Sequence, residues 1–160
     1  MRSPDVRPAT RADRPALVGL VRAYLDFYKA PQPEEAALQA FLDRLDTDRG
    51  RGVQLVAEQD GRLVGFASLV ASFDTLVAAE ILVMNDVFVM EAQRRQGIGQ
   101  ALFEASRRYA RDHGYVRLDW VTAADNHDAQ RFYDRHGGRR GPWISYSAIP
   151  AIASTADRKH

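Results

Sequence analysis

Hydrophobic residues along the chain recur with two different spacings, which separate the predicted helices from the predicted strands. The first helical pattern follows Thr10 and Asp13, two residues with the spacing of a capping box. Its apolar positions are Ala16, Leu17, Leu20, Val21, Tyr24, Leu25 and Tyr28. Pro31 and Pro33 interrupt the pattern, because proline breaks helices, and residues 34–45 resume it. The chain therefore begins with two predicted helices.

Strand-like segments occupy the middle of the chain. Residues 53–58 and 63–72 are apolar runs on either side of Asp60-Gly61, a dipeptide typical of hairpin turns, so they are predicted to form a β-hairpin. Residues 80–89 are apolar at nearly every position, as expected for a strand at the centre of a sheet. Shorter strands are predicted near Val6 and at residues 117–122 and 143–149.

Two further helices are predicted in the second half, from Ile98 to near Gly114 and from Asp128 to His136. A meander of strands followed by a strand–helix–strand crossover gives an α/β fold with a mixed, twisted central β-sheet and helices on both faces. The chain has 160 residues and neither a linker nor a repeat. We therefore expect one domain over residues 1–160, with flexible tails at residues 1–4 and 154–160.

Composition narrows the classes of function. Hydrophobic residues make up 46% and charged residues 27% of the chain, the balance of an ordinary soluble globular protein. A net charge of +1 gives no reason to expect a nucleic acid or a membrane as partner. The chain has no cysteine, and its four histidines lack the spacing of metal ligands, so no metal is expected. We find neither a signal peptide nor an apolar run of about 18 residues, and expect a cytoplasmic protein.

A basic turn with two glycines joins the strand at residues 80–89 to the helix that starts at Ile98. It reads Arg94-Arg95-Gln96-Gly97-Ile98-Gly99. Unpaired N–H groups at such a turn bind anions, because the helix dipole points the same way. A dinucleotide fingerprint wants a small residue where Leu102 sits, and a P-loop needs a lysine that is absent here. The alternative is a strand-to-helix turn that needs glycine and happens to be basic.

Polar residues in two other places are candidates for chemistry. Asn85 and Asp86 interrupt the apolar strand, where burial is costly unless their side chains are hydrogen-bonded. They are therefore either a structural pair or part of a site. Asn126 and Tyr133 are seven residues apart, on one face of the predicted helix. Their alternative roles are a helix cap and a packing tyrosine.

Together these segments resemble a known family. The pattern VFV-x4-RRQGIG-x2-L, followed downstream by N-x2-A-x2-FY, is similar to the two motifs of the GCN5-related N-acetyltransferase (GNAT) superfamily. The resemblance is closest to the polyamine and histone-tail acetyltransferase branch, which shares the Phe27-Tyr28 helix end and the Asp-Val-Phe-Val strand. Polyamine-type relatives often carry a glutamate at the position of Asn85. Asparagine, unlike glutamate, cannot act as a base.

The resemblance implies acetyl-CoA as the acetyl donor and assigns roles to residues of this chain. The backbone of Val87, Phe88 and Val89 would pair with the pantetheine arm. Arg94 opens the pyrophosphate-binding turn, whose main-chain N–H groups come from Arg95, Gln96, Gly97, Ile98, Gly99 and Gln100. Asn126 would bond a pantetheine amide, and Tyr133 would lie beside the sulfur. Phe27 and Tyr28 would line the amine pocket.

The resulting hypothesis is an N-acetyltransferase that moves an acetyl group from acetyl-CoA to a primary amine by direct attack in a ternary complex. Tyr133, Asn85 and Asp86 are the candidate catalytic residues. The general base stays open between Asp86, Glu80 and a chain of water molecules, and the amine could also arrive neutral. The alternative function is a non-catalytic acyl-CoA-binding regulatory module. A homodimer through residues 143–149 is expected by analogy with relatives.

Overall fold

The computed structural model describes residues 3–47 and 51–150. The chain divides into two compact units, Met1–Ala123 and Ala124–His160. The predicted tails at residues 1–4 and 154–160 lie partly or wholly outside the described residues. The expectation of a single domain stays a prediction.

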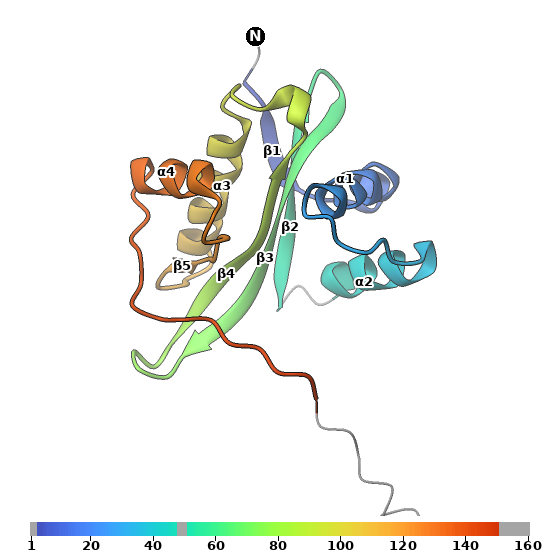
Figure 1. Cartoon of the computed structure of the whole chain (residues 1–160). Helices are drawn as coiled ribbons and strands as arrows, with labels where there is room; N and C mark the ends of the chain where they lie inside the picture. The colour runs from blue at the N-terminus through green and yellow to red at the C-terminus, as the bar shows by residue number, and fades with distance from the viewer. Residues whose placement is uncertain (1–2, 48–50, 151–160) are drawn as a thin grey trace, which may run out of the picture. The chain divides into compact units, whose positions relative to one another are not determined.

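A mixed five-stranded sheet forms the centre of the first unit, in the order β1-β2-β3-β4-β5 (Figure 1). Its strands are β1 (Asp5–Pro8), β2 (Gly52–Gln59), β3 (Arg62–Asp74), β4 (Ala79–Val89) and β5 (Leu118–Asp119). Neighbouring strands are antiparallel from β1 to β4, and β5 runs parallel to β4. The mixed sheet, the hairpin at Asp60-Gly61 and a strand at residues 80–89 are therefore confirmed, but β4 is next to last in the sheet rather than at its centre.

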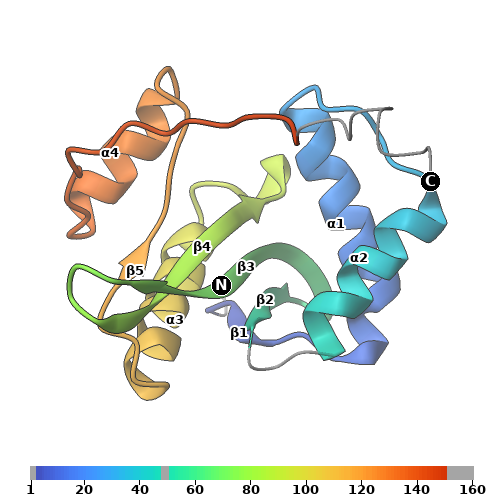
Figure 2. The same ribbon diagram turned by 90° about the horizontal axis from the view of Figure 1, so that it is seen from below.

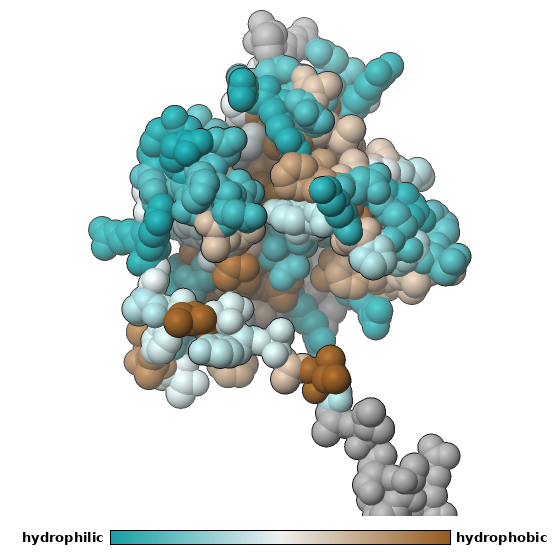
Figure 3. Space-filling model, in the orientation of Figure 1, coloured by the Kyte–Doolittle hydropathy of each residue, from teal (hydrophilic) through white to brown (hydrophobic). Residues whose placement is uncertain are grey.

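Helices cover both faces of this sheet (Figure 2). One face carries α1 (Arg14–Phe27) and α2 (Glu35–Thr47), and the other carries α3 (Ile98–Asp112). Two short 3-10 helices, Arg11–Asp13 and Glu91–Gln93, precede α1 and α3. The outward surfaces of α1 and α2 are largely hydrophilic (Figure 3), as expected of amphipathic helices lying on a sheet.

Apolar side chains between α1 and the sheet form the main core cluster. Its buried members are Leu17, Leu20, Val56, Phe66 and Phe88. A second cluster joins Val18 of α1 to Leu38 and Leu42 of α2. Burying one such side chain contributes about 1.5–3 kcal/mol, so these clusters hold both helices against the sheet.

The pairing of β4 with β5 is shorter than the sequence predicts. It joins only Leu82 to Leu118 and Val83 to Asp119, so the strand predicted at residues 117–122 is too long. A β-bulge follows on β4, because Ser68 pairs with Asp86 whereas Leu69 pairs with Met84. Asn85 is the extra residue, and a bulge bends its strand and increases its twist. Beyond Val83, no described strand pairs with this edge of β4.

The second unit contains α4 (His127–Arg135). The prediction of a strand at residues 143–149 is wrong, because these residues have no regular secondary structure. Trp143, Ile144, Tyr146 and Ile149 are all strongly exposed. An alternating apolar pattern makes a strand only where another backbone pairs with it, and no described strand pairs with this segment.

Candidate active site

The end of β4 presents backbone hydrogen-bonding groups at an open edge. The Met90 N–H donates to the Val64 carbonyl at 2.9 Å, which makes Met90 and Val64 a hydrogen-bonded pair. Because such pairs alternate along antiparallel strands, the N–H and C=O groups of Val87 and Val89 point away from β3. They face the side where β5 is no longer paired. An extended ligand could therefore pair with this edge as an added strand.

The turn after β4 has the backbone of an anion site. Arg95 and Gly97 both adopt left-handed conformations, with φ of 62° and 80°. Buried Ile98 anchors the start of α3 in the core, while the turn itself is exposed. Gly97 stands at the N-cap position and no side chain caps this helix. Its first N–H groups therefore lie at an exposed turn next to two arginines.

Only one of the two glycines of this turn, Gly97, is required by its backbone conformation. Gly97 needs the freedom of glycine because of its positive φ. Gly99 does not, since it lies within α3 and an added Cβ would meet only the Val89 Cγ2, at 3.9 Å. A turn that merely needs glycine explains Gly97 and leaves Gly99 unexplained. Close approach of a ligand to the backbone explains both.

Arg94 connects this turn to the end of α1. Its Nε donates to the Val89 carbonyl at 3.0 Å. Its guanidinium carbon lies 4.8 Å from the centre of the Phe27 ring and 5.7 Å from that of Phe88. The Phe27 ring in turn contacts Tyr28, with ring centres 5.0 Å apart. The structure thus brings Phe27 to the turn, which the sequence alone did not predict.

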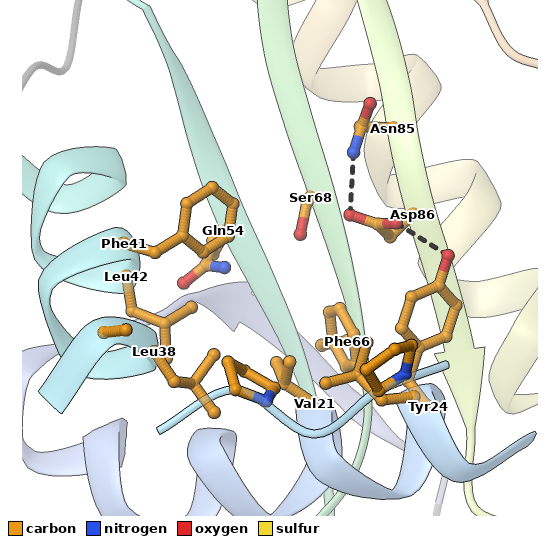
Figure 4. A pocket seen from close by; sticks show the side chains of 14 residues that line it. Val21, Tyr24, Leu38, Phe41, Leu42, Gln54, Phe66, Ser68, Asn85 and Asp86 are labelled. Atoms are coloured by element: carbon orange, nitrogen blue, oxygen red, sulfur yellow. Dashed lines mark hydrogen bonds between the residues drawn. The ribbon is translucent and has the colours of Figure 1, made fainter. Parts of the chain in front are cut away.

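A cavity of about 390 Å³ lies on the α1 and α2 side of the sheet (Figure 4). Its apolar walls come from both helices and from the segment between them. They are Val21, Leu25, Pro31, Pro33, Ala37, Leu38, Phe41 and Leu42, with Phe66 of β3. Its polar lining consists of Tyr24, Gln54, Ser68, Asn85 and Asp86. The volume lies at the small end of the range for small-molecule sites.

The bulge on β4 explains why Asn85 and Asp86 both line this cavity. In a regular strand, consecutive side chains point to opposite faces, and a bulge breaks that alternation. The Tyr24 hydroxyl donates to Asp86 Oδ1 at 2.8 Å, and the Asn85 amide donates to Asp86 Oδ2 at 3.0 Å (Figure 4). Both carboxylate oxygens are held by donors. The polar pair is therefore hydrogen-bonded and also lines a cavity.

Sequence reasoning missed three polar residues of this cavity. Tyr24 fits the helical apolar pattern and was assigned to the core, while Gln54 and Ser68 are single polar residues within apolar strands. The interruption of an apolar strand by a single polar residue was the signal that could have revealed Gln54 and Ser68. Phe27 and Tyr28, predicted for the amine pocket, are half-exposed and do not line the cavity. Tyr24, one turn earlier and 5.1 Å from Tyr28 between ring centres, lines it instead.

Asn126 and Tyr133 belong to the second unit, on α4. The Asn126 Oδ1 accepts a hydrogen bond from the Ala129 N–H at 3.1 Å, so this residue does cap the helix. Tyr133 is buried, and its ring contacts Phe132 edge to face. The carbonyl of Tyr133 accepts a hydrogen bond from the Gly138 N–H at 2.8 Å, which closes the end of α4.

The described residues contain neither a metal-binding group nor a membrane-spanning helix. No group of three histidine, cysteine, aspartate or glutamate side chains in residues 3–47 and 51–150 could hold a metal ion. Within the same ranges, no helix is long and apolar enough to cross a membrane.

The open strand edge, the basic turn that follows it and the small cavity with a carboxylate match the acyl-CoA transferase class that the sequence motifs predict, and comparisons with known proteins identify the family. The sequence profile of the Acetyltransferase (GNAT) family matches residues 17–138. The uncharacterized N-acetyltransferase YhfO of Bacillus subtilis (strain 168) is 30% identical over 133 residues, 83% of this chain and 88% of that protein. The D-amino-acid N-acetyltransferase HPA3 of Saccharomyces cerevisiae is 31% identical over 124 residues, 77% of each chain.

A solved structure agrees with the sequence relatives. The crystal structure of a probable acetyltransferase superposes with a TM-score of 0.80 at 28% identity, covering 94% of this chain and 99% of that one. The chain belongs to the GNAT acetyltransferase family and is an acetyl-CoA-dependent N-acetyltransferase.

Proposed function

We propose that this enzyme moves the acetyl group of acetyl-CoA to a primary amine by direct attack in a ternary complex. The observation that carries the proposal is that β4 has an open backbone edge and also lines the cavity. Val87 and Val89 offer backbone groups at its open edge, and Asn85 and Asp86 line the cavity. Strand residues rise about 3.3 Å each, so Asp86 lies within about 10 Å of both valines along β4. Direct transfer needs its two reactants held this closely.

The residues present fit the donor. The outward N–H and C=O groups of Val87 and Val89 match the amides of a pantetheine arm, while Phe88 pairs with β3. The N–H groups from Arg95 to Gln100 would bind the pyrophosphate, beside the positive charge of Arg94. The Asn126 Oδ1 already caps α4, so its Nδ2 is the atom that would donate to a pantetheine carbonyl.

The reaction forms one N–C bond and breaks one C–S bond. The amine nitrogen attacks the thioester carbon, and Asp86 takes up the proton that the amine loses. One N–H of the Val87 and Val89 edge, the one that the pantetheine arm leaves unpaired, is the donor for the oxyanion that develops. CoA then leaves as a thiolate, and Tyr133 supplies its proton. Asn85 and Tyr24 hold the Asp86 carboxylate in position.

The structure favours Asp86 over Glu80 as the base. Asp86 lies in the cavity wall, whereas Glu80 pairs with Phe73 near the other end of β4 and does not line the cavity. Asn85 carries an amide and cannot accept the proton. The placement near the polyamine and histone-tail branch stays a prediction, because the relatives above do not support it.

Acetyl-CoA binding is tested by thermal unfolding with different nucleotide ligands. Acetyl-CoA should raise Tm, because a ligand that binds only the native state stabilises it, by about 2.7 kcal/mol at 100 times its Kd. NAD and ATP should raise Tm clearly less at equal concentration, although they also carry phosphates. A shift with NAD and none with acetyl-CoA would refute the donor assignment.

A cytoplasmic homodimer that pairs through residues 143–149 is part of the same proposal. Trp143, Ile144, Tyr146 and Ile149 are between 77% and 89% exposed, and clustered apolar side chains of this kind mark interaction surfaces. Light scattering coupled to size-exclusion chromatography should give a molar mass twice the chain mass of 17.9 kDa. A monomer at all concentrations would rule the dimer out.

A further inference from the structure

Three polar residues form a row across the floor of the cavity. Gln54 on β2 pairs with Ser68 on β3, and Ser68 pairs with Asp86 on β4. Directly paired residues point to the same face of a sheet, here the face under α1 and α2 (Figure 4). Neighbouring strands are about 4.8 Å apart, so the backbones at the two ends of the row are roughly 10 Å apart. One small molecule can reach both ends.

Gln54, at the end opposite Asp86, has an unsatisfied acceptor. Its side chain is only 3% exposed, and within the described part of the chain its Oε1 has no hydrogen-bond partner. Leaving a buried polar atom unpaired costs about 1–3 kcal/mol. A donor on a bound molecule would satisfy this oxygen. Because Gln54 lines the cavity, a molecule bound there is the ligand that could supply this donor.

The charge of the lining restricts what can bind. Asp86 is the one ionisable carboxylate among the lining residues, which include no lysine, arginine or histidine. A free amino acid would place its own carboxylate near Asp86 with no cation to compensate, and an unpaired buried charge is costly. A second ammonium group at the Gln54 end would likewise lack a carboxylate. The apolar walls favour an uncharged body between the two ends.

We propose that the acceptor is a small primary amine with an apolar body and a neutral hydrogen-bond donor at its far end, which Gln54 Oε1 accepts. This inference rests on the proposed function, because it places the reacting nitrogen at the Asp86 end of the row. Gln54 is then a specificity-determining residue. The hydroxyl or N–H that it recognises takes no part in the acetyl transfer.

Six probes separate the contribution of the far-end donor from those of the other groups of the molecule. Tyramine carries a phenolic hydroxyl, 4-methoxyphenethylamine replaces that donor by an acceptor, and phenethylamine has neither. D- and L-tyrosine add a carboxylate to tyramine, and spermidine adds further ammonium groups. The measurement is CoA-thiol release by the full chain with saturating acetyl-CoA, and calorimetry gives the Kd of each amine.

The expected kcat/KM for tyramine exceeds that for 4-methoxyphenethylamine by at least about tenfold, since a site with an unpaired acceptor rejects a ligand that lacks the donor. Both tyrosines and spermidine should be poorer still. Gln54→Met should bring the ratio of kcat/KM for tyramine to kcat/KM for 4-methoxyphenethylamine close to one. The control is Gln59→Met, further along β2 and outside the cavity lining, which should keep the wild-type ratio.

Failure of this inference is distinguishable from failure of the proposed function. Amine-dependent CoA release with equal kcat/KM for tyramine and its methoxy analogue, or with the tyrosines preferred, would overturn the acceptor class and leave acetyl transfer standing. Stabilisation by acetyl-CoA with no release for any amine would overturn both. The comparison of the probes uses the wild-type chain, so the test does not depend on the Gln54 variant folding.

Discussion

In the proposed mechanism, the hydroxyl of Tyr133 donates the proton to the leaving CoA thiolate. The thiol of CoA resembles that of cysteine, with a pKa of about 8.5, whereas an unperturbed tyrosine has a pKa of about 10. Proton transfer from tyrosine to the leaving thiolate is therefore uphill unless the site lowers the pKa of the phenol. Positioned acid catalysis still contributes about 10²–10⁴ in rate.

Tyr133→Phe removes that hydroxyl and keeps the ring. We expect kcat to fall by about 10²–10⁴, or roughly 3–5 kcal/mol in the activation barrier, with the Kd of acetyl-CoA nearly unchanged. The edge-to-face contact with Phe132 is retained. Calorimetry and steady-state kinetics on the same preparation check this. An unaltered kcat would remove Tyr133 from the mechanism and assign proton delivery to water.

Asp13 gives a prediction about stability. It accepts two hydrogen bonds from the Arg7 guanidinium, at 2.7 and 2.9 Å, and one from the Thr10 N–H. Hydrogen bonds from Arg7 hold the pKa of Asp13 well below its usual range. A lowered carboxyl pKa stabilises the folded state above the unfolded pKa of about 3.9, and this contribution is lost as the pH falls further.

Asp13→Asn should therefore lower the free energy of unfolding by about 1–3 kcal/mol at pH 7, the value of hydrogen bonds to a charged group. The difference from the wild type should shrink as the pH falls below about 4. Urea unfolding across this pH range measures it. Asp5→Asn, at an exposed carboxylate on β1, is the control and should change stability little. An effect of Asp13→Asn that is constant with pH would contradict the ion-pair explanation.

Among the secondary-structure elements, the N-terminus of α3 carries the donor hypothesis. Gly99→Val should weaken acetyl-CoA binding by at least about tenfold, or 1.4 kcal/mol, because the side chain would occupy the space of the pyrophosphate. The fold should tolerate the change, since a Cβ at this position makes only an ordinary contact with Val89. Titration calorimetry measures the affinity, and circular dichroism the fold.

Gly19→Val is the matched control for this substitution. Gly19 is an exposed glycine inside α1 with open space around its Cβ position, and it does not line the cavity. The same side chain is then added to a helix away from the turn, with acetyl-CoA affinity expected at the wild-type value. Equal loss of affinity in both variants would mean that helix destabilisation, rather than the turn, explains the effect.

Local patterns predicted the elements whose cause is local. The Asp60-Gly61 turn, the strand at residues 80–89 and the helix from Ile98 each depend on residues adjacent in sequence. The bulge at Asn85 depends on the register between β3 and β4, which no single segment reveals. The predicted strand at residues 143–149 failed for the same reason, because its alternation is local whereas pairing is tertiary.

The residues of the candidate site likewise divide into those that a local motif predicts and those that only tertiary pairing brings together. The turn from Arg94 to Gly99 could be found by its motif, since the residues that form it are consecutive. Gln54, Ser68 and Asp86 could not be grouped, because they come together only through the pairing of three strands. Phe27 and Tyr28 were predicted to line the amine pocket, which stays a prediction, and Tyr24 rather than either of them lines this cavity.

In the proposed mechanism, β4 contributes to the binding sites of both substrates. The donor pairs with the open edge that Val87 and Val89 present, and the acceptor enters the cavity under α1 and α2. Transfer needs no covalent enzyme intermediate, because the amine can attack the thioester itself. Both substrates must then be bound before either product leaves.

Initial-rate kinetics with both substrates varied test this central claim most directly. CoA-thiol release is measured over a grid of acetyl-CoA and tyramine concentrations, or with the best amine of the panel. The account predicts amine-dependent release and intersecting double-reciprocal lines, the pattern of a ternary complex. Parallel lines, the signature of a covalent acetyl-enzyme, or acetyl-CoA binding without release for any amine, would contradict it.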